Sequence, residues 1–339
     1  MSVAVLSAVW LLLVLASPGI AAAESAAPNT PAPAGIAVDG EGNVYVTDYA
    51  LDRVVKFAPD GSVLGQWGTS GTALGEFNAP FGLTIDDHGT LYVVDQLNSR
   101  IQRFGLDGTP LGAWGAPGAG VTELRTPFGV TFAGGRLYVA DFGNDRVQVL
   151  APDGSPIATM GGHGSGDGQF MRPAGVAIDR DGALYVTDHF NDRVQKFSVD
   201  GAFVTALGSP PLPTATATGT VGVPSATIVG TLTATATPAP GVQSETQLRR
   251  PEGIAIDREG NVWVADYGRD RIVKFAPDGR LIQAVGGRGS GPTEFVGPKG
   301  LAIDVQTGHV LVADTGNARI QRLAADGSAA AIWPLPPAP

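Results

Sequence analysis

Short apolar runs and turn-forming residues alternate along most of this chain. The apolar runs of the first such unit cover residues 35–39, 43–48, 53–57 and 62–67. Runs of this length that are rich in Val, Ile and aromatic residues and bounded by Gly or Asp predict β-strands. Asp60-Gly61, between the last two runs, predicts a tight hairpin because both residues tolerate a positive φ. The unit is therefore expected to form four antiparallel strands.

The same pattern is repeated six times. The copies open at Pro33, Pro80, Pro127, Pro173, Pro251 and Pro298. A repeat of this size is one supersecondary unit that cannot bury its own faces and must stack on its neighbours. Four-stranded antiparallel units arranged radially form a β-propeller. We therefore predict an all-β fold, a six-bladed β-propeller with four antiparallel strands per blade, over residues 33–333.

The predicted ring must close between the first and the sixth copy. Trp67, Trp114 and Trp333 fall at one aligned position in the fourth predicted strand. The sixth copy therefore completes its own fourth strand, and each copy is expected to be one whole blade. Closure then depends on packing between the first and sixth blades. The alternative is a shared strand, formed if residues 24–32 pair with an outer edge.

One interval between copies is longer than the others. Copies four and five open 78 residues apart, against 46 or 47 residues elsewhere. The extra length lies in the segment 209–243, which is rich in Thr, Ala and Pro and has no charged residue. Such a low-complexity segment cannot build a core of its own. We expect this insert to project from the connector between blades four and five.

Two short motifs recur in the copies. Pro-x-Gly followed by an aliphatic residue opens each copy, and Asp-x-x-Asn-x-Arg follows the second predicted strand of most copies. This pattern resembles the NHL repeat, and the resemblance implies the propeller fold over all six copies. It does not select a function, because NHL propellers include enzymes, RNA-binding modules, protein-binding modules and extracellular sensor domains. Leu51 and Arg269 stand where the motif usually has Asn.

The N-terminal segment 1–23 carries no charged side chain and has an apolar core at 9–15 that Pro18-Gly19 interrupts. This pattern predicts a secretory signal peptide. An uncleaved N-terminal anchor is the alternative, because the segment is just long enough to span a thin bilayer. Both alternatives predict a secreted, periplasmic or cell-surface propeller. The flanking segments are expected to be a linker at 24–32 and a Pro-rich tail at 334–339.

Composition narrows the partners that we expect. The formal net charge is −10, whereas binding to nucleic acid requires clustered Lys and Arg, so no nucleic-acid partner is expected. The chain has no cysteine, which excludes a disulfide framework and thiol chemistry. We expect a monomer that contacts a membrane only if the N-terminal segment stays uncleaved.

An Asp and an Arg five residues apart flank the loop between the second and third strands of every copy. A buried carboxylate beside a guanidinium can be catalytic, but six identical copies favour a structural role, since one active site requires asymmetry. Matched charges would let a polar loop be buried. The pairs are Asp48/Arg53, Asp95/Arg100, Asp141/Arg146, Asp188/Arg193, Asp266/Arg271 and Asp314/Arg319.

Histidine positions argue against a catalytic metal. NHL-like amidating lyases bind zinc through several channel histidines, one of them directly before a blade Asp. The four histidines of this chain are expected on two faces, with His163 and His189 apart from His88 and His309, so no three-histidine site forms. Gluconolactonase-type propellers need a channel cluster of carboxylates and Asn, and none is evident. We predict no metal, no cofactor and no catalytic residue. The residues before the blade Asp are Thr47, Val94, Ala140, Thr187, Ala265 and Ala313.

The positions that vary between copies are candidates for ligand binding. Two of them, the middle of Pro-x-Gly and the residue after the blade Asp, should ring one mouth of the central channel. The first set is Ala34, Phe81, Phe128, Ala174, Glu252 and Lys299; the second is Tyr49, Gln96, Phe142, His189, Tyr267 and Thr315. Aromatic groups with a few charges at a concave rim suit a binding surface. The alternative is that these positions are simply unconstrained.

We therefore predict a non-catalytic module that binds a protein, peptide or glycan on one face. The alternative function is a lyase or hydrolase with its active site in the channel. We expect the rim aromatics to be exposed and dispensable for stability, because other copies have Ala, Thr or Gln in the same places. The predicted binding residues are Tyr49, Phe81, Gln96, Phe128, Phe142, His189, Glu252, Tyr267 and Lys299.

Overall fold

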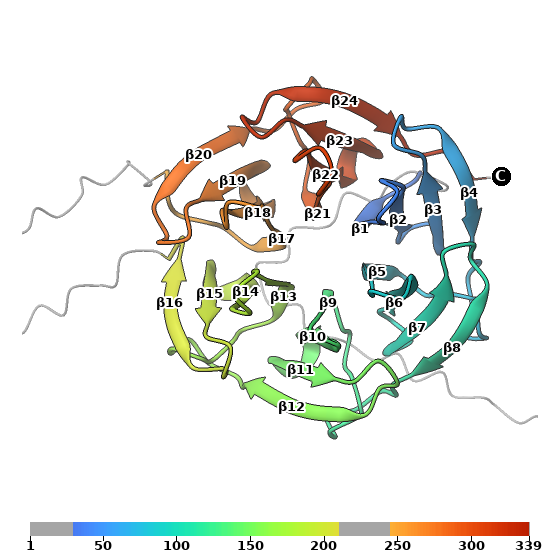
Figure 1. The fold of residues 1–339 in the computed structure, drawn as a ribbon, viewed down its shortest axis with the longest axis horizontal. Coiled ribbons are helices and arrows are strands. Elements are labelled where there is room, and N and C mark those ends of the chain that lie inside the picture. The colour runs from blue at the N-terminus through green and yellow to red at the C-terminus, as the bar shows by residue number, and fades with distance from the viewer. Residues whose placement is uncertain (1–29, 210–244, 339) are drawn as a thin grey trace, which may run out of the picture.

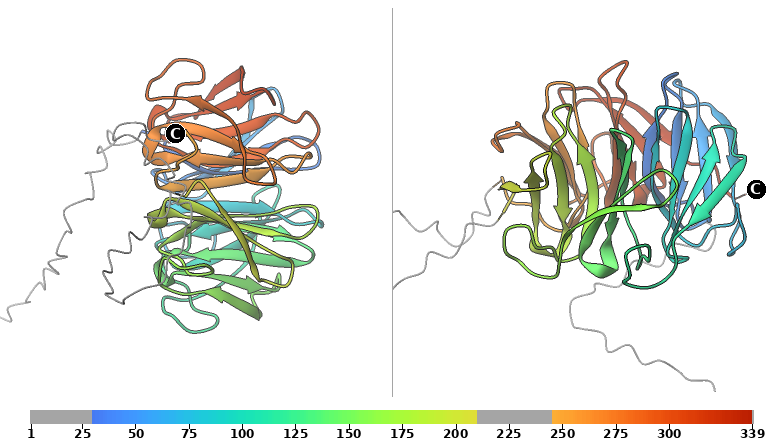
Figure 2. Two further views of the ribbon diagram at one scale, coloured as in Figure 1. Left: turned by 90° about the vertical axis from the view of Figure 1, so that its left-hand side faces the viewer. Right: turned by 60° about the horizontal axis from the view of Figure 1, so that its bottom comes forward.

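The computed structural model describes residues 30–209 and 245–338 and has six sheets of four antiparallel strands around a central channel (Figure 1). Each sheet consists of four strands that are consecutive in the chain, so each repeat is one whole blade. Side views show the blades packed side by side, with loops on two opposite faces (Figure 2). The predicted fold is thus confirmed. The predicted signal segment or anchor 1–23, residues 24–29 of the linker and insert residues 210–243 lie outside the described residues.

The strands of a blade are numbered from the channel outward. The first strands are β1 (Pro33–Val38), β5 (Pro80–Ile85), β9 (Val130–Ala133), β13 (Pro173–Ile178), β17 (Pro251–Ile256) and β21 (Pro298–Ile303). The second strands are β2 (Val44–Asp48), β6 (Thr90–Asp95), β10 (Arg136–Asp141), β14 (Leu184–Asp188), β18 (Val262–Asp266) and β22 (Val310–Asp314). The third strands are β3 (Arg53–Phe57), β7 (Arg100–Gly105), β11 (Arg146–Leu150), β15 (Arg193–Phe197), β19 (Arg271–Phe275) and β23 (Arg319–Leu323). The fourth strands are β4 (Val63–Trp67), β8 (Pro110–Trp114), β12 (Pro156–Gly161), β16 (Phe203–Leu207), β20 (Leu281–Gly286) and β24 (Ala329–Pro334).

Two local features differ from the sequence-based expectation. The described residues contain no α-helix, but four of the loops that the sequence predicts between second and third strands form 3-10 turns. In blade 3, β9 begins at Val130 rather than at Pro127, although the Phe128 amide still donates to the Ala140 oxygen at 2.9 Å. No helix among the described residues is long and apolar enough to cross a membrane. The 3-10 turns are η1 (Phe142–Asn144), η2 (His189–Asn191), η3 (Tyr267–Arg269) and η4 (Thr315–Asn317).

The Pro-x-Gly glycines allow the inner strands of neighbouring blades to approach one another closely. A Cβ at Gly82 would lie 2.5 Å from the backbone oxygen of Phe128, and one at Gly253 would lie 2.1 Å from that of Lys299. At all six glycines an added Cβ would clash with a backbone oxygen of the neighbouring blade. The contact of Gly300 with Ala34 closes the ring. The close approach between backbones, rather than an unusual φ, therefore requires glycine at these positions.

Blades 1 and 6 close the ring by packing. One apolar cluster combines Val46, Val55 and Phe57 of blade 1 with Leu311 and Trp333 of blade 6. Phe57 and Trp333 stack with their ring centroids 6.1 Å apart. Within the described residues each sheet keeps its own four strands, so the predicted closure without a shared strand is what the structure contains.

The six predicted Asp/Arg pairs are all present. The Arg Nε atom lies 2.6–3.1 Å from the Asp Oδ2 atom, and every one of these carboxylates is fully buried. In Asp188, burial raises the pKa, and hydrogen bonds from the Met171 amide, Asn191 and Arg193 oppose this. The guanidinium group also ties the blade to the connector that enters it. Arg100, for example, donates to the backbone oxygens of Thr72, Ala73 and Glu76.

Candidate functional site

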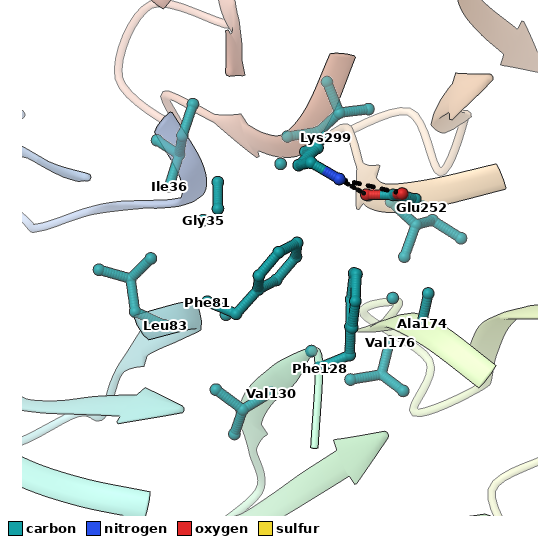
Figure 3. Close-up of a pocket in the computed structure, with 18 residues that line it drawn as sticks. Gly35, Ile36, Phe81, Leu83, Phe128, Val130, Ala174, Val176, Glu252 and Lys299 are labelled. Atoms are coloured by element: carbon teal, nitrogen blue, oxygen red, sulfur yellow. Dashed lines mark hydrogen bonds and ion pairs between the residues drawn. The ribbon is translucent and has the colours of Figure 1, made fainter. Parts of the chain in front are cut away.

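A small cavity, partly open to solvent, lies in the channel where the six Pro-x-Gly segments meet (Figure 3). Each blade contributes the middle residue, the glycine and the aliphatic residue after it, because the inner strands all begin at this end of the channel. The variable residues that line the cavity are Ala34, Phe81, Phe128, Ala174, Glu252 and Lys299. The first set of variable positions therefore meets in one place.

The lining is asymmetric around the ring. Phe81 and Phe128 come from the adjacent blades 2 and 3, and Glu252 and Lys299 come from the adjacent blades 5 and 6, on the opposite side of the channel (Figure 3). Ala34 and Ala174, from blades 1 and 4, stand between the two groups. An apolar wall therefore faces a charged wall across the channel. The six equivalent positions of the repeat therefore form a site whose two sides differ in chemistry.

The charged wall is a buried ion pair. Lys299 Nζ lies 3.1 and 3.2 Å from the two carboxylate oxygens of Glu252, and both side chains are largely buried. The ammonium also lies over the rings of Tyr267, Phe81 and Tyr49, at 4.5, 5.4 and 6.0 Å from their centroids. Burial by itself would lower the pKa of Lys299, but the Glu252 carboxylate outweighs it and the pKa is raised. Lys299 therefore stays charged.

Six ring side chains form a continuous series around the mouth, which we call the aromatic arc. Phe81 and Phe128 have their centroids 3.8 Å apart, and the other steps are 5.0–6.5 Å. On blade 2 the residue after the blade Asp is Gln96, which has no ring. Its backbone oxygen accepts a hydrogen bond from the Ser99 amide at 3.1 Å. In order, the arc consists of Tyr49, Phe81, Phe128, Phe142, His189 and Tyr267.

The expectation that these aromatics are exposed is wrong. Phe81 and His189 are buried, and the other rings of the arc are half-buried. Phe81 belongs to an apolar cluster that joins blades 1, 2 and 3, and Phe128 and Tyr49 pack against that cluster. Adjacent variable positions have come into contact with one another rather than with solvent. The side chains therefore contribute to the packing of the mouth, which a comparison of isolated repeats does not reveal.

His189 lies where the aromatic arc meets the charged wall. It is the first residue of η2 and is 7% exposed. Burial lowers its pKa, and the nearby Glu252 carboxylate opposes the shift. Its Nδ1 atom lies 3.3 Å from the backbone oxygen of Pro251. Because a carbonyl only accepts hydrogen bonds, the proton of the neutral ring is on Nδ1, and Nε2 is an acceptor.

The sequence analysis missed Phe190. Among the aromatic side chains that the structure describes, this is the one classed as exposed, at 46%. Its ring lies 4.8 Å from that of His189, and the Arg250 guanidinium is 5.9 Å from its centroid. A second cation, Arg172, lies 5.4 Å from the ring of Phe142. A signal was available, because the other copies have Ala, Leu or Gly where blade 4 has Phe190.

The described residues contain no group of three or more His, Cys, Asp or Glu side chains that could hold a metal ion. Away from the arc, His163 lies with its Nδ1 atom 2.9 Å from Asp145 and is 71% exposed. On the opposite face, His309 Nδ1 is 3.2 Å from Arg322. The histidines are thus divided between the two faces in the way that their blade positions imply.

Family comparison supports the repeat assignment. The family model of the NHL repeat matches residues 170–197 and 295–323. Both matches begin at a buried connector phenylalanine and end with the third strand of a blade. The chain is a six-bladed β-propeller that contains NHL repeats. A second family model, the SMP-30/Gluconolactonase/LRE-like region, matches residues 229–296 of the chain.

Two curated relatives are similar to part of the propeller. Peptidyl-glycine alpha-amidating monooxygenase B of Xenopus laevis is 34% identical over 88 residues, which are 24% of this chain and 10% of that protein. A probable peptidyl-alpha-hydroxyglycine alpha-amidating lyase of Caenorhabditis elegans is 32% identical over 82 residues, 23% of each chain. The match therefore spans less than a quarter of the length of these relatives.

Solved structures are similar over most of the propeller. An inactive variant of virginiamycin B lyase from Staphylococcus aureus, solved with quinupristin, covers 91% of this chain and 86% of its own, with a TM-score of 0.57 and 16% identity. A gluconolactonase from Xanthomonas campestris covers 85% and 84%, with a TM-score of 0.58 and 16% identity. At such low identity these likenesses establish the fold alone.

Proposed function

We propose that this NHL propeller is exported and acts as a non-catalytic binding module for a protein, peptide or glycan. The ligand is held on the face where the Pro-x-Gly segments meet the loops between second and third strands. The observation that carries the proposal is the aromatic arc, two of whose members, Phe142 and His189, lie beside the exposed ring of Phe190. Aromatic side chains held rigidly around a concave opening provide contact area at a low cost in conformational entropy.

The charges around the arc also support binding on this face. The chain as a whole has a net charge of −10, yet Arg172 and Arg250 stack on rings of the mouth, and Lys299 is held within it. Stacked guanidinium groups are held in place and present donors in a fixed geometry. The mouth thus carries positively charged side chains, whereas the protein as a whole has a negative net charge.

The test is a pull-down from an envelope extract with the purified propeller and two single variants. Phe190→Ala removes the exposed ring from the mouth. Val199→Ala is the matched control, because Val199 is 79% exposed in the hairpin at the other end of the same blade. We expect specific capture that Phe190→Ala weakens and Val199→Ala preserves. Capture that is equal in both variants would place the binding surface elsewhere.

A second function, a lyase or hydrolase with its site in the channel, has one observation in its favour. Glu252, a buried carboxylate, lies near the neutral imidazole of His189, and two such groups in different environments suit acid–base chemistry. The relatives named as lyases raise the same alternative. Turnover of a peptidyl-alpha-hydroxyglycine substrate that is lost on His189→Gln, with folding intact, would favour this function over the first.

A further inference from the structure

Two arginines occupy the same place in adjacent blades, directly before the proline that opens the copy. They are Arg172 on blade 4 and Arg250 on blade 5, where the other copies have Ala, Thr or Gly. Their amides donate to Asp145 and Asp192, at 2.7 Å each, which fixes both turns. The Gly297 amide of blade 6 is held by an aspartate in the same way. The turn itself therefore does not require a charged side chain.

The guanidinium group of Arg172 has no carboxylate partner among the described residues. It lies 5.4 Å from the ring centroid of Phe142, and its hydrogen bond to the backbone oxygen of Phe142 is long, at 3.5 Å. Asp145, which accepts from the Arg172 amide, directs its other oxygen to His163 at 2.9 Å. Arg172 is half-buried. Its positive charge and most of its N–H donors are therefore left for a ligand.

The exposed ring of Phe190 lies beside this charge. Its centroid is 6.5 Å from that of Phe142, on which Arg172 stacks. The Arg250 guanidinium lies 5.9 Å from the Phe190 centroid and adds a second positive charge. These four residues, contributed by blades 3, 4 and 5, form a patch that we call the arginine surface. It combines an exposed apolar ring with two stacked guanidinium groups.

The charge of the arginine surface favours a carboxylate ligand. A guanidinium and a carboxylate form charge-assisted hydrogen bonds, which are roughly twice as strong as neutral ones. Because Arg172 is already stacked on Phe142, little freedom of its side chain is lost when a carboxylate binds. At physiological ionic strength, charges farther away than about 8 Å are largely screened. The local arginines therefore outweigh the net charge of −10 of the whole chain.

The surroundings of Phe190 favour a peptide over an acidic sugar. Arg250 lies over this ring, and His189 contacts it in an edge-to-face arrangement, with the centroids 4.8 Å apart. A sugar packs through a broad C–H face that requires an open ring face, whereas an apolar side chain also packs against a ring edge. A peptide supplies an acidic and an apolar side chain at neighbouring positions of one chain.

We propose that the arginine surface binds an acidic peptide. A side-chain carboxylate of the peptide pairs with the Arg172 guanidinium, and a neighbouring apolar side chain packs on Phe190. The charge of Arg250 attracts the peptide to this part of the mouth. This inference rests on the proposed function and narrows its ligand to a peptide segment that contains Asp or Glu.

The experiment measures the fluorescence anisotropy of labelled peptides that are titrated with the full chain. The peptides are short and blocked at both ends, and in them Phe alternates with Asp, Asn or Lys. Arg172→Gln removes the unmatched charge, and Phe190→Ala removes the exposed ring. Arg258→Gln is the matched control, because Arg258 is exposed in the loop between β17 and β18 on the opposite face.

We expect the Asp peptide to bind, the Asn peptide to bind about tenfold more weakly because it lacks the charge, and the Lys peptide not to bind. Arg172→Gln should weaken binding of the Asp peptide about tenfold and leave that of the Asn peptide unchanged. Phe190→Ala should weaken binding of both peptides, since both carry the apolar side chain. Arg258→Gln should change neither affinity.

Several results would overturn the inference. They are equal affinity for the Asp and Asn peptides, binding of the Asp peptide that Arg172→Gln or Phe190→Ala preserves, and no binding of the Asp peptide at millimolar concentrations. Binding of polygalacturonate in place of the Asp peptide would make the ligand an acidic sugar. A weakening by Arg258→Gln equal to that by Arg172→Gln would remove the arginine surface as its cause.

The binding module and the acidic peptide can fail separately. A pull-down that depends on Phe190 while the Asp peptide fails would leave the binding module standing and reject only the acidic peptide. Circular dichroism of each variant establishes that it is folded before its affinity is compared.

Discussion

Arg53 Nη1 donates a hydrogen bond to the backbone oxygen of Pro337 at 3.1 Å, across 284 residues of sequence. In blades 2 to 6 the equivalent arginine holds backbone oxygens of the connector that arrives from the preceding blade. Within the described residues no blade precedes blade 1, and Pro336 and Pro337 occupy the place of that connector. The segment predicted as a tail is therefore part of the ring closure, and Leu335 within it is 5% exposed.

A chain that stops at Pro334 should be less stable, because Arg53 loses two acceptors and the buried Leu335 is removed. We expect a loss of about 2–4 kcal/mol, the sum of a buried apolar side chain and charge-assisted hydrogen bonds. Urea denaturation measures it. A chain that stops at Pro337 keeps all these contacts and is the control. Equal stability of the two chains would mean that residues 335–337 do not contribute to closure.

Gly82→Ala should destabilise the propeller, since its Cβ would lie 2.5 Å from the backbone oxygen of Phe128. The blades would have to separate, and overpacking of this kind costs about 1–3 kcal/mol. Gly65→Ala is the matched control, because Gly65 is also in a strand and its Cβ would meet no atom within 4 Å. Thermal melting compares the two variants. If the Gly82→Ala and Gly65→Ala variants melted at the same temperature, the close approach between backbones would not be the reason for glycine at position 82.

Asp141→Ala should leave Arg146 without its buried partner. Breaking a buried ion pair costs about 3–5 kcal/mol, and Asp266→Ala should behave alike because its pair has the same geometry, with 2.7 Å between Nε and Oδ2 in both. Asp60→Ala, in an exposed hairpin, is the control. Chemical denaturation gives the three values. A variant of Asp141 or Asp266 that kept its stability but lost a function would contradict the structural interpretation of that pair.

Phe81→Ala combined with Phe128→Ala should destabilise the protein by about 3 kcal/mol or more, because the two rings pack on each other and on the apolar cluster of blades 1 to 3. This reverses the expectation from sequence that the change costs little. Phe190→Ala, whose ring is exposed, should cost less than about 1 kcal/mol. Unfolding curves in urea distinguish them. Similar curves for the double variant and the unchanged protein would restore the sequence-based expectation.

His189 should make stability depend on pH. Its folded pKa lies below the usual 6.5 because burial disfavours the charged ring, so the unfolded chain binds the proton more readily. Its contribution is fully present above pH 6.5 and decreases as the pH falls through 6.5 toward the folded pKa. Denaturation between about pH 8 and about pH 5 measures this. The His189→Gln variant should lose less stability over that range than the unchanged protein. An identical loss in both proteins would contradict the assignment of this pH dependence to His189.

The repeated pattern was sufficient to predict the architecture. The Pro-x-Gly openings, the Asp-Gly turns and the spacing of the copies each depend on local backbone chemistry, and they specified six blades of four strands. The Asp/Arg pairs were visible for the same reason, since the two partners flank one short loop. The ends of elements were less predictable, as β9 and the 3-10 turns show, because packing against neighbouring blades decides them.

The tertiary structure alone decided how the variable residues meet. From sequence, Phe81, Phe128, Glu252 and Lys299 were four rim positions; only the closed ring places the first two opposite the last two and joins Glu252 to Lys299 across two blades. The contact of Arg53 with Pro337 was hidden for the same reason. A repeat determines the blade that it forms, whereas contacts between different blades depend on the curvature that closes the ring, and no single repeat contains that information.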